Sequence, residues 1–304
     1  MNRACETTTQ ATRDSETTES GETTPSRPRL RSGIALMVSS SISNQVGASF
    51  GAMAFPTIGP VGVVAIRQFI TAAVLVPLVR PRFRGLGAKR WWLVAGLAVV
   101  FSVMNLCLYA AVERIGLGLG VTLEFLGPLA VAIASSRRRL DYACALLAGI
   151  GVVVLTNPGP SADVVGISLA LIAAAGWACY ILLNRSIGQQ LPGLEGPALA
   201  STVSAVAWVP VAAWWFASHG VTATALALAV ACGILSSVVP YVADLSALRY
   251  VPTHIFGTFT SVNPVWAALA GWLLLGQMLE VNEWVGIVLI VASNAVVVRG
   301  GGAR

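Results

Sequence analysis

Residues 116–134 read GLGLGVTLEFLGPLAVAIA, a run of 19 residues that is apolar apart from Thr122 and Glu124. About 20 mostly apolar residues suffice to cross a bilayer as a helix. An ionisable carboxyl at bilayer depth is costly, so it usually faces a pathway or a partner instead of lipid. Glu124 therefore makes transport across a membrane the first function to consider.

The composition of the whole chain points to the same class. Of 304 residues, 56% are hydrophobic and 11% are charged, whereas a soluble domain carries roughly 25% charged residues. Continuous apolar runs favour helices over a barrel. We therefore predict an all-α membrane protein with ten transmembrane helices, at about residues 33–54, 61–79, 92–111, 117–135, 140–156, 164–183, 197–217, 223–247, 254–275 and 283–298.

The first 31 residues differ from the rest. They are rich in Thr, Ser and Glu and hold almost no large apolar side chain before Leu30. Such a segment cannot bury enough surface to fold, and it lacks the apolar core of a secretory signal peptide. We expect a disordered cytoplasmic tail at 1–31, followed by two five-helix units at 32–158 and 159–299.

The basic residues are distributed by membrane side. If the N-terminus is cytoplasmic, fifteen Lys and Arg fall in the tail end, the inside loops and the C-terminus, and Arg114 alone falls in an outside loop. The net charge of +6 is therefore not a signature of nucleic-acid binding. The positive-inside rule predicts cytoplasmic termini and an even number of spans.

The two halves of the chain resemble each other. Gly127-Pro128-Leu-Ala-Val-Ala in the first corresponds to Asn263-Pro264-Val-Trp-Ala-Ala in the second. Each proline is expected inside a helix, where it frees a backbone carbonyl. An odd number of helices per half inverts the second unit, and inverted repeats with broken helices are typical of secondary transporters with a central site. Close helix packing through small residues is the alternative explanation.

Glu124 and Arg67 are the leading candidates for the site. A carboxyl in an apolar environment can exchange a proton near neutral pH, as a proton-coupled exchanger requires, or it can pair with a substrate ammonium group. A structural bond to a neighbouring helix is the alternative. Arg67 can bind a substrate carboxylate bidentately, pair with Glu124, or extend to the outer interface.

Polar and aromatic side chains in other predicted spans are further candidates for lining a cavity. Asp244 is expected in an inner vestibule or in a pair with Arg249. For the others, interhelical packing with a satisfied polar tip is the alternative. The remaining substrate or proton site candidates are Asn44, Gln45, Asn105, Tyr109, Trp177, Tyr180, Asp244, Thr260 and Asn263.

Catalytic and metal signatures are missing from the sequence. The five cysteines show no C-x-x-C spacing, and the two histidines, His219 and His254, lie near span ends. We therefore predict no metal site and no cofactor, and we expect a protein that is not an enzyme.

Residues 123–132, LEFLGPLAVA, followed by SSRR at 135–138, resemble the threonine/homoserine exporters of the EamA branch of the drug/metabolite transporter superfamily. Gly176-Trp177-Ala178 and Pro240-Tyr241 add to this resemblance. It implies ten helices in two inverted five-helix repeats, proton antiport, and a role for Glu124 and Arg67. Two departures bear on substrate identity and coupling: Asn263 stands where such proteins tend to have glutamate, and Ala52 stands where relatives carry lysine.

The resulting hypothesis is an exporter of small amino acids in a bacterial cytoplasmic (inner) membrane. Its partners would be the lipid bilayer, a small-molecule substrate and protons, without nucleic acid, and it would act as a monomer or weak dimer. Export of drugs, nucleosides or other metabolites is the alternative within the transporter class. A membrane-embedded enzyme or a receptor is the least favoured alternative.

Overall fold

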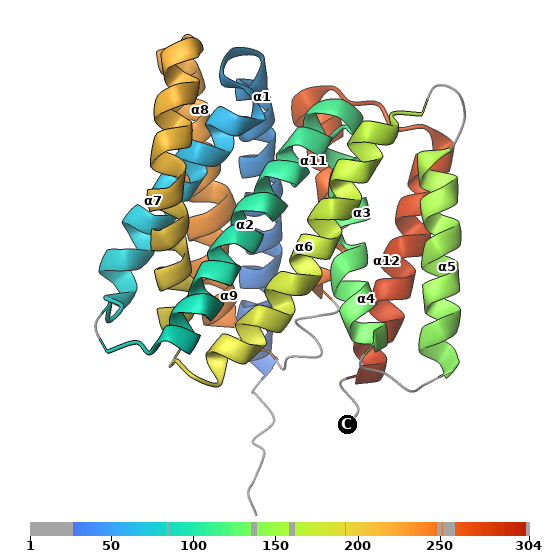
Figure 1. Cartoon of the computed structure of the whole chain (residues 1–304). Helices are drawn as coiled ribbons and strands as arrows, with labels where there is room; N and C mark the ends of the chain where they lie inside the picture. Colours follow the sequence, from blue (N-terminus) through green and yellow to red (C-terminus); the bar gives the residue numbers. More distant parts are fainter. Residues whose placement is uncertain are drawn as a thin grey trace, which may run out of the picture.

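The computed structural model describes residues 27–83, 85–134, 139–157, 162–191, 193–247, 251 and 259–301. Within these ranges every regular element is a helix (Figure 1). The predicted tail lies outside the described residues up to residue 26, and so do Arg137, Arg138, Arg249 and His254. The helices are α1 Arg27–Val79, α2 Ala88–Ile115, α3 Leu117–Glu124, α4 Leu126–Ala134, α5 Arg139–Thr156, α6 Val164–Gly188, α7 Glu195–Ser218, α8 Ala223–Gly233, the π-helical turn η1 Ile234–Val238, α9 Val239–Ala247, α11 Asn263–Leu275 and α12 Val281–Gly301.

The helices have the length and the exterior of membrane spans. In the described residues, eight helical stretches are long and apolar enough to cross a bilayer, and α11 is a shorter apolar helix. Large apolar side chains cover the outside, where Trp92 is 79% exposed and Leu146 is 69% exposed. Because such surface is unfavourable in water, the protein is a multi-pass membrane protein, and the predicted all-helical membrane class is confirmed.

The first helix contains a sharp bend instead of the predicted loop at 55–60. Residues 27–79 stay helical except at Gly59, whose φ of 63° and ψ of 172° place it in a region open mainly to glycine. The indole Nε1 of Trp215 in α7 donates a 2.8 Å hydrogen bond to the carbonyl of Ile58, so the bend does not leave this group unpaired. The chain thus rises through one half of α1 and returns through the other (Figure 1).

Helices from the two ends of the sequence interlock. The bent α1 packs against α7, α8, η1 and α9, while α2 packs against α6, α3 against α11, and α5 against α12. Helices from residues 27–156 therefore bury their inner faces mainly against helices from residues 164–301. The core and any internal cavity lie between the two parts of the chain.

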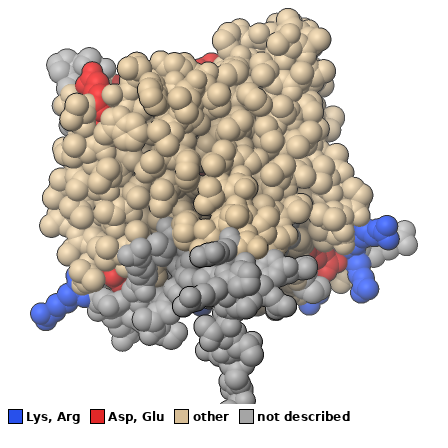
Figure 2. All heavy atoms as spheres, turned by 180° about the vertical axis from the view of Figure 1, so that it is seen from behind, with Lys and Arg blue, Asp and Glu red and all other residues tan. Residues whose placement is uncertain are grey.

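Charged side chains are confined to the ends of the bundle on the face seen in Figure 2. A broad band without charge separates a lower rim, which carries Lys and Arg together with some acidic side chains, from an upper rim where acidic side chains alone are visible. The described chain ends, at the start of α1 and the end of α12, lie at the lower end (Figure 1). The molecule therefore has one basic end and an apolar belt of membrane type.

Candidate substrate cavity

A cavity of about 470 Å³ lies between the two parts of the bundle. It extends from the middle of the molecule, at Glu124, toward the basic end, where Met37 of α1 and Leu194 before α7 line it. All the candidate site residues predicted from the sequence line this cavity, namely Asn44, Gln45, Arg67, Asn105, Tyr109, Glu124, Trp177, Tyr180, Asp244, Thr260 and Asn263.

Glu124 is the last residue of α3, and the cause is local. Pro128, four residues later, has no N–H to donate to the carbonyl of Glu124, so the helix stops and resumes at Leu126 as α4. The Glu124 side chain lines the cavity while the residue is only 6% exposed. Among the described residues, its carboxyl group forms no hydrogen bond or ion pair, so the pair with Arg67, one of the alternatives considered from the sequence, is not formed in this structure.

Arg67 enters the cavity from α1 and is held by three hydrogen bonds. Its Nε donates to the hydroxyl of Ser237 at 3.1 Å, its Nη1 to the hydroxyl of Tyr109 at 3.2 Å, and its Nη2 to the carbonyl of Ser236 at 3.2 Å. The guanidinium also lies 5.4 Å from the centre of the Tyr109 ring. These bonds leave further N–H groups of the guanidinium for another acceptor.

The serines that hold Arg67 belong to the π-helical turn η1, which the sequence analysis did not predict. Pro240 lacks the N–H that would pair with the Ser236 carbonyl in an α-helix, and π-turns often occur at functional sites. Besides the bonds from Arg67, two further bonds tie η1 to α1: the hydroxyl of Ser43 donates to the Leu235 carbonyl at 2.9 Å, and that of Ser236 donates to the Asn44 carbonyl at 3.0 Å. The only sign of this turn in the sequence is Pro240, which follows Ser236 by four residues and Ser237 by three.

The other candidates surround the same space from α1, α2, α6 and α9. The Asn105 Nδ2 donates to the Phe101 carbonyl at 2.7 Å, so its amide is partly committed to its own helix. Trp177 of α6 packs edge-on against Phe125, with ring centres 4.7 Å apart. Tyr180 lies beside Phe101 at 6.1 Å. Aromatic faces and amides thus line the wall next to Glu124.

The second proline-associated break lies across the cavity, at the start of α11. The sequence predicts Pro264 inside a helix spanning 254–275, and residues 252–258 of that span lie outside the described part. In the described part, a turn at Ser261–Val262 precedes α11, and Pro264 lies in the first turn of that helix. The break before Pro128, at Phe125, has the same position relative to its proline. Both predicted breaks therefore exist, but each precedes its proline.

The comparisons with known proteins agree with this arrangement. The chain is 34% identical to the threonine/homoserine exporter RhtA of Escherichia coli (strain K12) over 268 residues, which are 86% of this chain and 89% of that protein. Residues 164–299 match the model of the EamA-like transporter family. The chain belongs to the EamA-like transporter family. The resemblance inferred from residues 123–138 is thereby confirmed.

Further similarities extend over most of this EamA-like transporter. RhtA of Salmonella typhimurium (strain LT2) is 35% identical over 86% of the chain, and the uncharacterized transporter YwfM of Bacillus subtilis (strain 168) is 26% identical over 70% of it. Those matches cover 88% and 76% of the respective proteins. A solved crystal structure, 18% identical, superposes with a TM-score of 0.56 over 91% of this chain and 99% of its own. That last similarity concerns the fold alone.

The cavity of this EamA-like transporter offers two kinds of recognition. Arg67 presents N–H donors suited to a carboxylate, and Glu124 presents an acceptor suited to an ammonium group. In the described residues, no three His, Cys, Asp or Glu side chains form a group suited to a metal ion. The donors of Arg67 and the acceptor of Glu124 are chemically complementary to the two charged groups of a small zwitterion.

Proposed function

We propose that the protein exports small amino acids, of the threonine and homoserine type, from the cytoplasm in exchange for protons. The observation that carries this proposal is the shared cavity of Arg67 and Glu124: a fixed cation and a carboxyl that has no partner among the described residues line one internal space. Its volume of about 470 Å³ lies in the range typical of small-molecule sites. The two relatives named as threonine/homoserine exporters support the choice of substrate.

In this proposal the substrate lies between Arg67 and Glu124. Its carboxylate accepts from the free N–H groups of Arg67, which Ser237, Tyr109 and the Ser236 carbonyl hold in place. Its ammonium group donates to the Glu124 carboxylate. Both bonds form away from bulk water, where charge-assisted hydrogen bonds are strong.

Protonation of Glu124 would couple transport to protons. The Glu124 side chain is 6% exposed and forms no hydrogen bond or ion pair with the described residues, so it can hold either a proton or a cationic group of the substrate. An arriving substrate ammonium stabilises the carboxylate and expels the proton, and a proton from the other side displaces the substrate. Glu124 thus binds the substrate while the site moves one way and a proton while it moves the other way. No catalytic step is involved.

We further propose ten spans in two inverted repeats, at 32–158 and 159–299, after a disordered tail at 1–31, with both termini in the cytoplasm of a bacterial inner membrane. The two halves of α1 around Gly59, the paired breaks at Phe125 and Ser261–Val262, and the basic lower rim support this arrangement. The cavity then opens to the cytoplasm, and one monomer contains the whole site.

Cells that overproduce the protein provide the test. They should tolerate toxic concentrations of homoserine or threonine and release labelled threonine faster than cells with empty vector. The same strain producing Arg67→Gln at equal membrane abundance is the matched control and should resemble the empty vector. Unchanged tolerance and release with the wild type would refute the choice of substrate.

A further inference from the structure

Asn263 is a cavity-lining amide whose hydrogen bonding is incomplete. It is the first residue of α11, and its Oδ1 is buried with no hydrogen-bond partner in the described part of the protein. An unpaired buried carbonyl oxygen destabilises a fold. The amide of Asn105, by contrast, already donates to its own helix at 2.7 Å. In the described residues, Asn263 therefore keeps a side-chain oxygen that no protein group has taken.

The packing of α3 against α11 places Asn263 at the depth of Glu124. A Cβ on Gly118 would lie 3.1 Å from the Cα of Ala268, so the two helices touch at that pair. They run antiparallel, because Leu117, one residue earlier, lies against Gly271 farther along α11. Glu124 follows Gly118 by six residues and Asn263 precedes Ala268 by five. At about 1.5 Å per residue, Glu124 lies roughly 9 Å and Asn263 roughly 7.5 Å from the crossing, in the same direction along the helices.

We propose that Asn263 forms a hydrogen bond with the side-chain hydroxyl of the substrate; this proposal rests on the proposed function. A hydroxyl both donates and accepts, and a primary amide offers one group of each kind. Rotation of the amide about its last bond exchanges Oδ1 and Nδ2, so Asn263 can turn its unpaired oxygen toward a hydroxyl donor. With Glu124 at the same depth, the ammonium and hydroxyl groups of one small molecule are within reach of the two side chains.

This assignment makes the preferred substrates small hydroxylated amino acids and disfavours apolar isosteres. Threonine has a hydroxyl where valine has a methyl group. A comparison of the two substrates therefore measures the contact between that hydroxyl and Asn263. Valine leaves the Asn263 amide unpaired, and a site built to bond a hydroxyl rejects such an analogue. We expect the wild type to transport threonine about tenfold more efficiently than valine, the equivalent of one net hydrogen bond.

The test compares transport of labelled threonine and valine into proteoliposomes that contain wild-type protein, Asn263→Leu or Asn263→Asp. Leucine has the shape of asparagine without its polar atoms, and aspartate keeps an acceptor oxygen. Asn263→Leu should lower the threonine-to-valine ratio about tenfold while valine transport persists, which also shows that the variant is folded. Asn263→Asp should keep a preference for threonine.

A matched control replaces Asn282, an amide in α12 that donates to the Val154 carbonyl at 3.3 Å and does not line the cavity. Asn282→Leu should keep the wild-type ratio. An unchanged ratio in Asn263→Leu, or an equal loss of both substrates, would overturn the assignment while leaving amino-acid export intact. Failure of the wild type to transport either amino acid would instead refute the proposed function and the assignment with it.

Discussion

The carbonyl of Ser236 accepts a 3.2 Å hydrogen bond from the Nη2 of Arg67. Four residues later, Pro240 has no N–H with which to compete for that oxygen. A proline in one helix thus supplies an acceptor for a cation in another. Among the described residues, Arg67 forms no ion pair with a carboxylate, and its three hydrogen bonds go to two hydroxyls and a carbonyl.

Pro240→Ala should weaken substrate binding. The new N–H can bond the Ser236 carbonyl in α-helical geometry and draw it away from Arg67. Because one hydrogen bond is redirected, we expect KM for threonine to rise about three- to tenfold with little loss of thermal stability. Pro210→Ala, at an exposed proline inside α7, is the control and should leave KM unchanged. Equal KM values for wild type and Pro240→Ala would contradict this role of the proline.

Arg67→Lys should impair transport although it keeps the positive charge. A lysine ammonium is a point charge that cannot reproduce the planar set of bonds to Ser237, Tyr109 and the Ser236 carbonyl. We expect kcat/KM for threonine to fall by at least about tenfold, measured in proteoliposomes. Arg185→Lys, in the last turn of α6, should behave as wild type. Normal transport by Arg67→Lys would mean that charge alone suffices.

Gly127→Ala should destabilise the protein. A Cβ at this position of α4 would overlap the carbonyl oxygen of Ala174 in α6, so the two helices would have to separate. We expect a loss of about 1–3 kcal/mol, seen as a lower thermal unfolding midpoint in detergent. Gly149→Ala is the matched control, because nothing lies within 4 Å of its Cβ position. A midpoint unchanged by Gly127→Ala would show that the contact is looser than the structure indicates.

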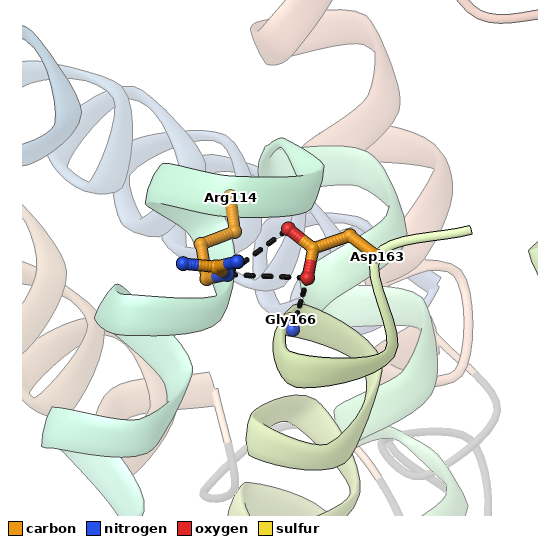
Figure 3. A network of polar contacts seen from close by, with 3 residues as sticks. All are labelled: Arg114, Asp163 and Gly166. Atoms are coloured by element: carbon orange, nitrogen blue, oxygen red, sulfur yellow. Dashed lines mark hydrogen bonds and ion pairs between the residues drawn. The ribbon is translucent and has the colours of Figure 1, made fainter. Parts of the chain in front are cut away.

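Asp163, the residue before α6, joins the start of α6 to the end of α2 through Arg114 (Figure 3). Its carboxylate accepts from the Gly166 N–H at 2.9 Å, which caps α6, and one of its oxygens lies 3.0 Å from the Nε of Arg114. The Gly166 bond first, and Arg114 in addition, hold the pKa of Asp163 below its ordinary value.

A carboxyl whose pKa is lower in the folded than in the unfolded protein stabilises the fold at any pH above its unfolded pKa. This stabilisation is lost as the pH falls through the pKa of the folded state. Asp163→Ala should therefore lower the thermal midpoint at neutral pH, and the difference from wild type should disappear only in strong acid. Asp163→Asn, which can still cap the helix, should have a smaller effect. A midpoint difference that is constant from neutral to strongly acidic pH would contradict the ionic contribution.

Much of the fold and the lining of the cavity could be predicted from the sequence because the membrane constrains polar groups so strongly. Polar side chains such as Glu124 and Gln45 cannot face lipid, so their appearance in apolar helices predicts that they point inward, and they line the cavity. Whether they bind substrate or protons stays a prediction.

Two features of the backbone, the π-turn η1 and the bend at Gly59, could not be predicted from the sequence. The π-turn that brings Ser237 to Arg67 shifts hydrogen bonding by one residue, and Pro240 is its only mark in the sequence. The bend at Gly59 depends on a distant partner, Trp215, which bonds the Ile58 carbonyl. Contacts between residues more than 150 positions apart leave no local pattern, so only the structure shows them.

The most direct test of proton-coupled amino-acid export is threonine transport driven by an imposed pH gradient across proteoliposomes, in wild type and Glu124→Gln. We predict that the wild type accumulates labelled threonine against its gradient while protons flow the other way. Glu124→Gln, at equal incorporation, should show no gradient-driven accumulation. Accumulation by Glu124→Gln at the wild-type level, or a wild type that ignores the pH gradient, would contradict the account.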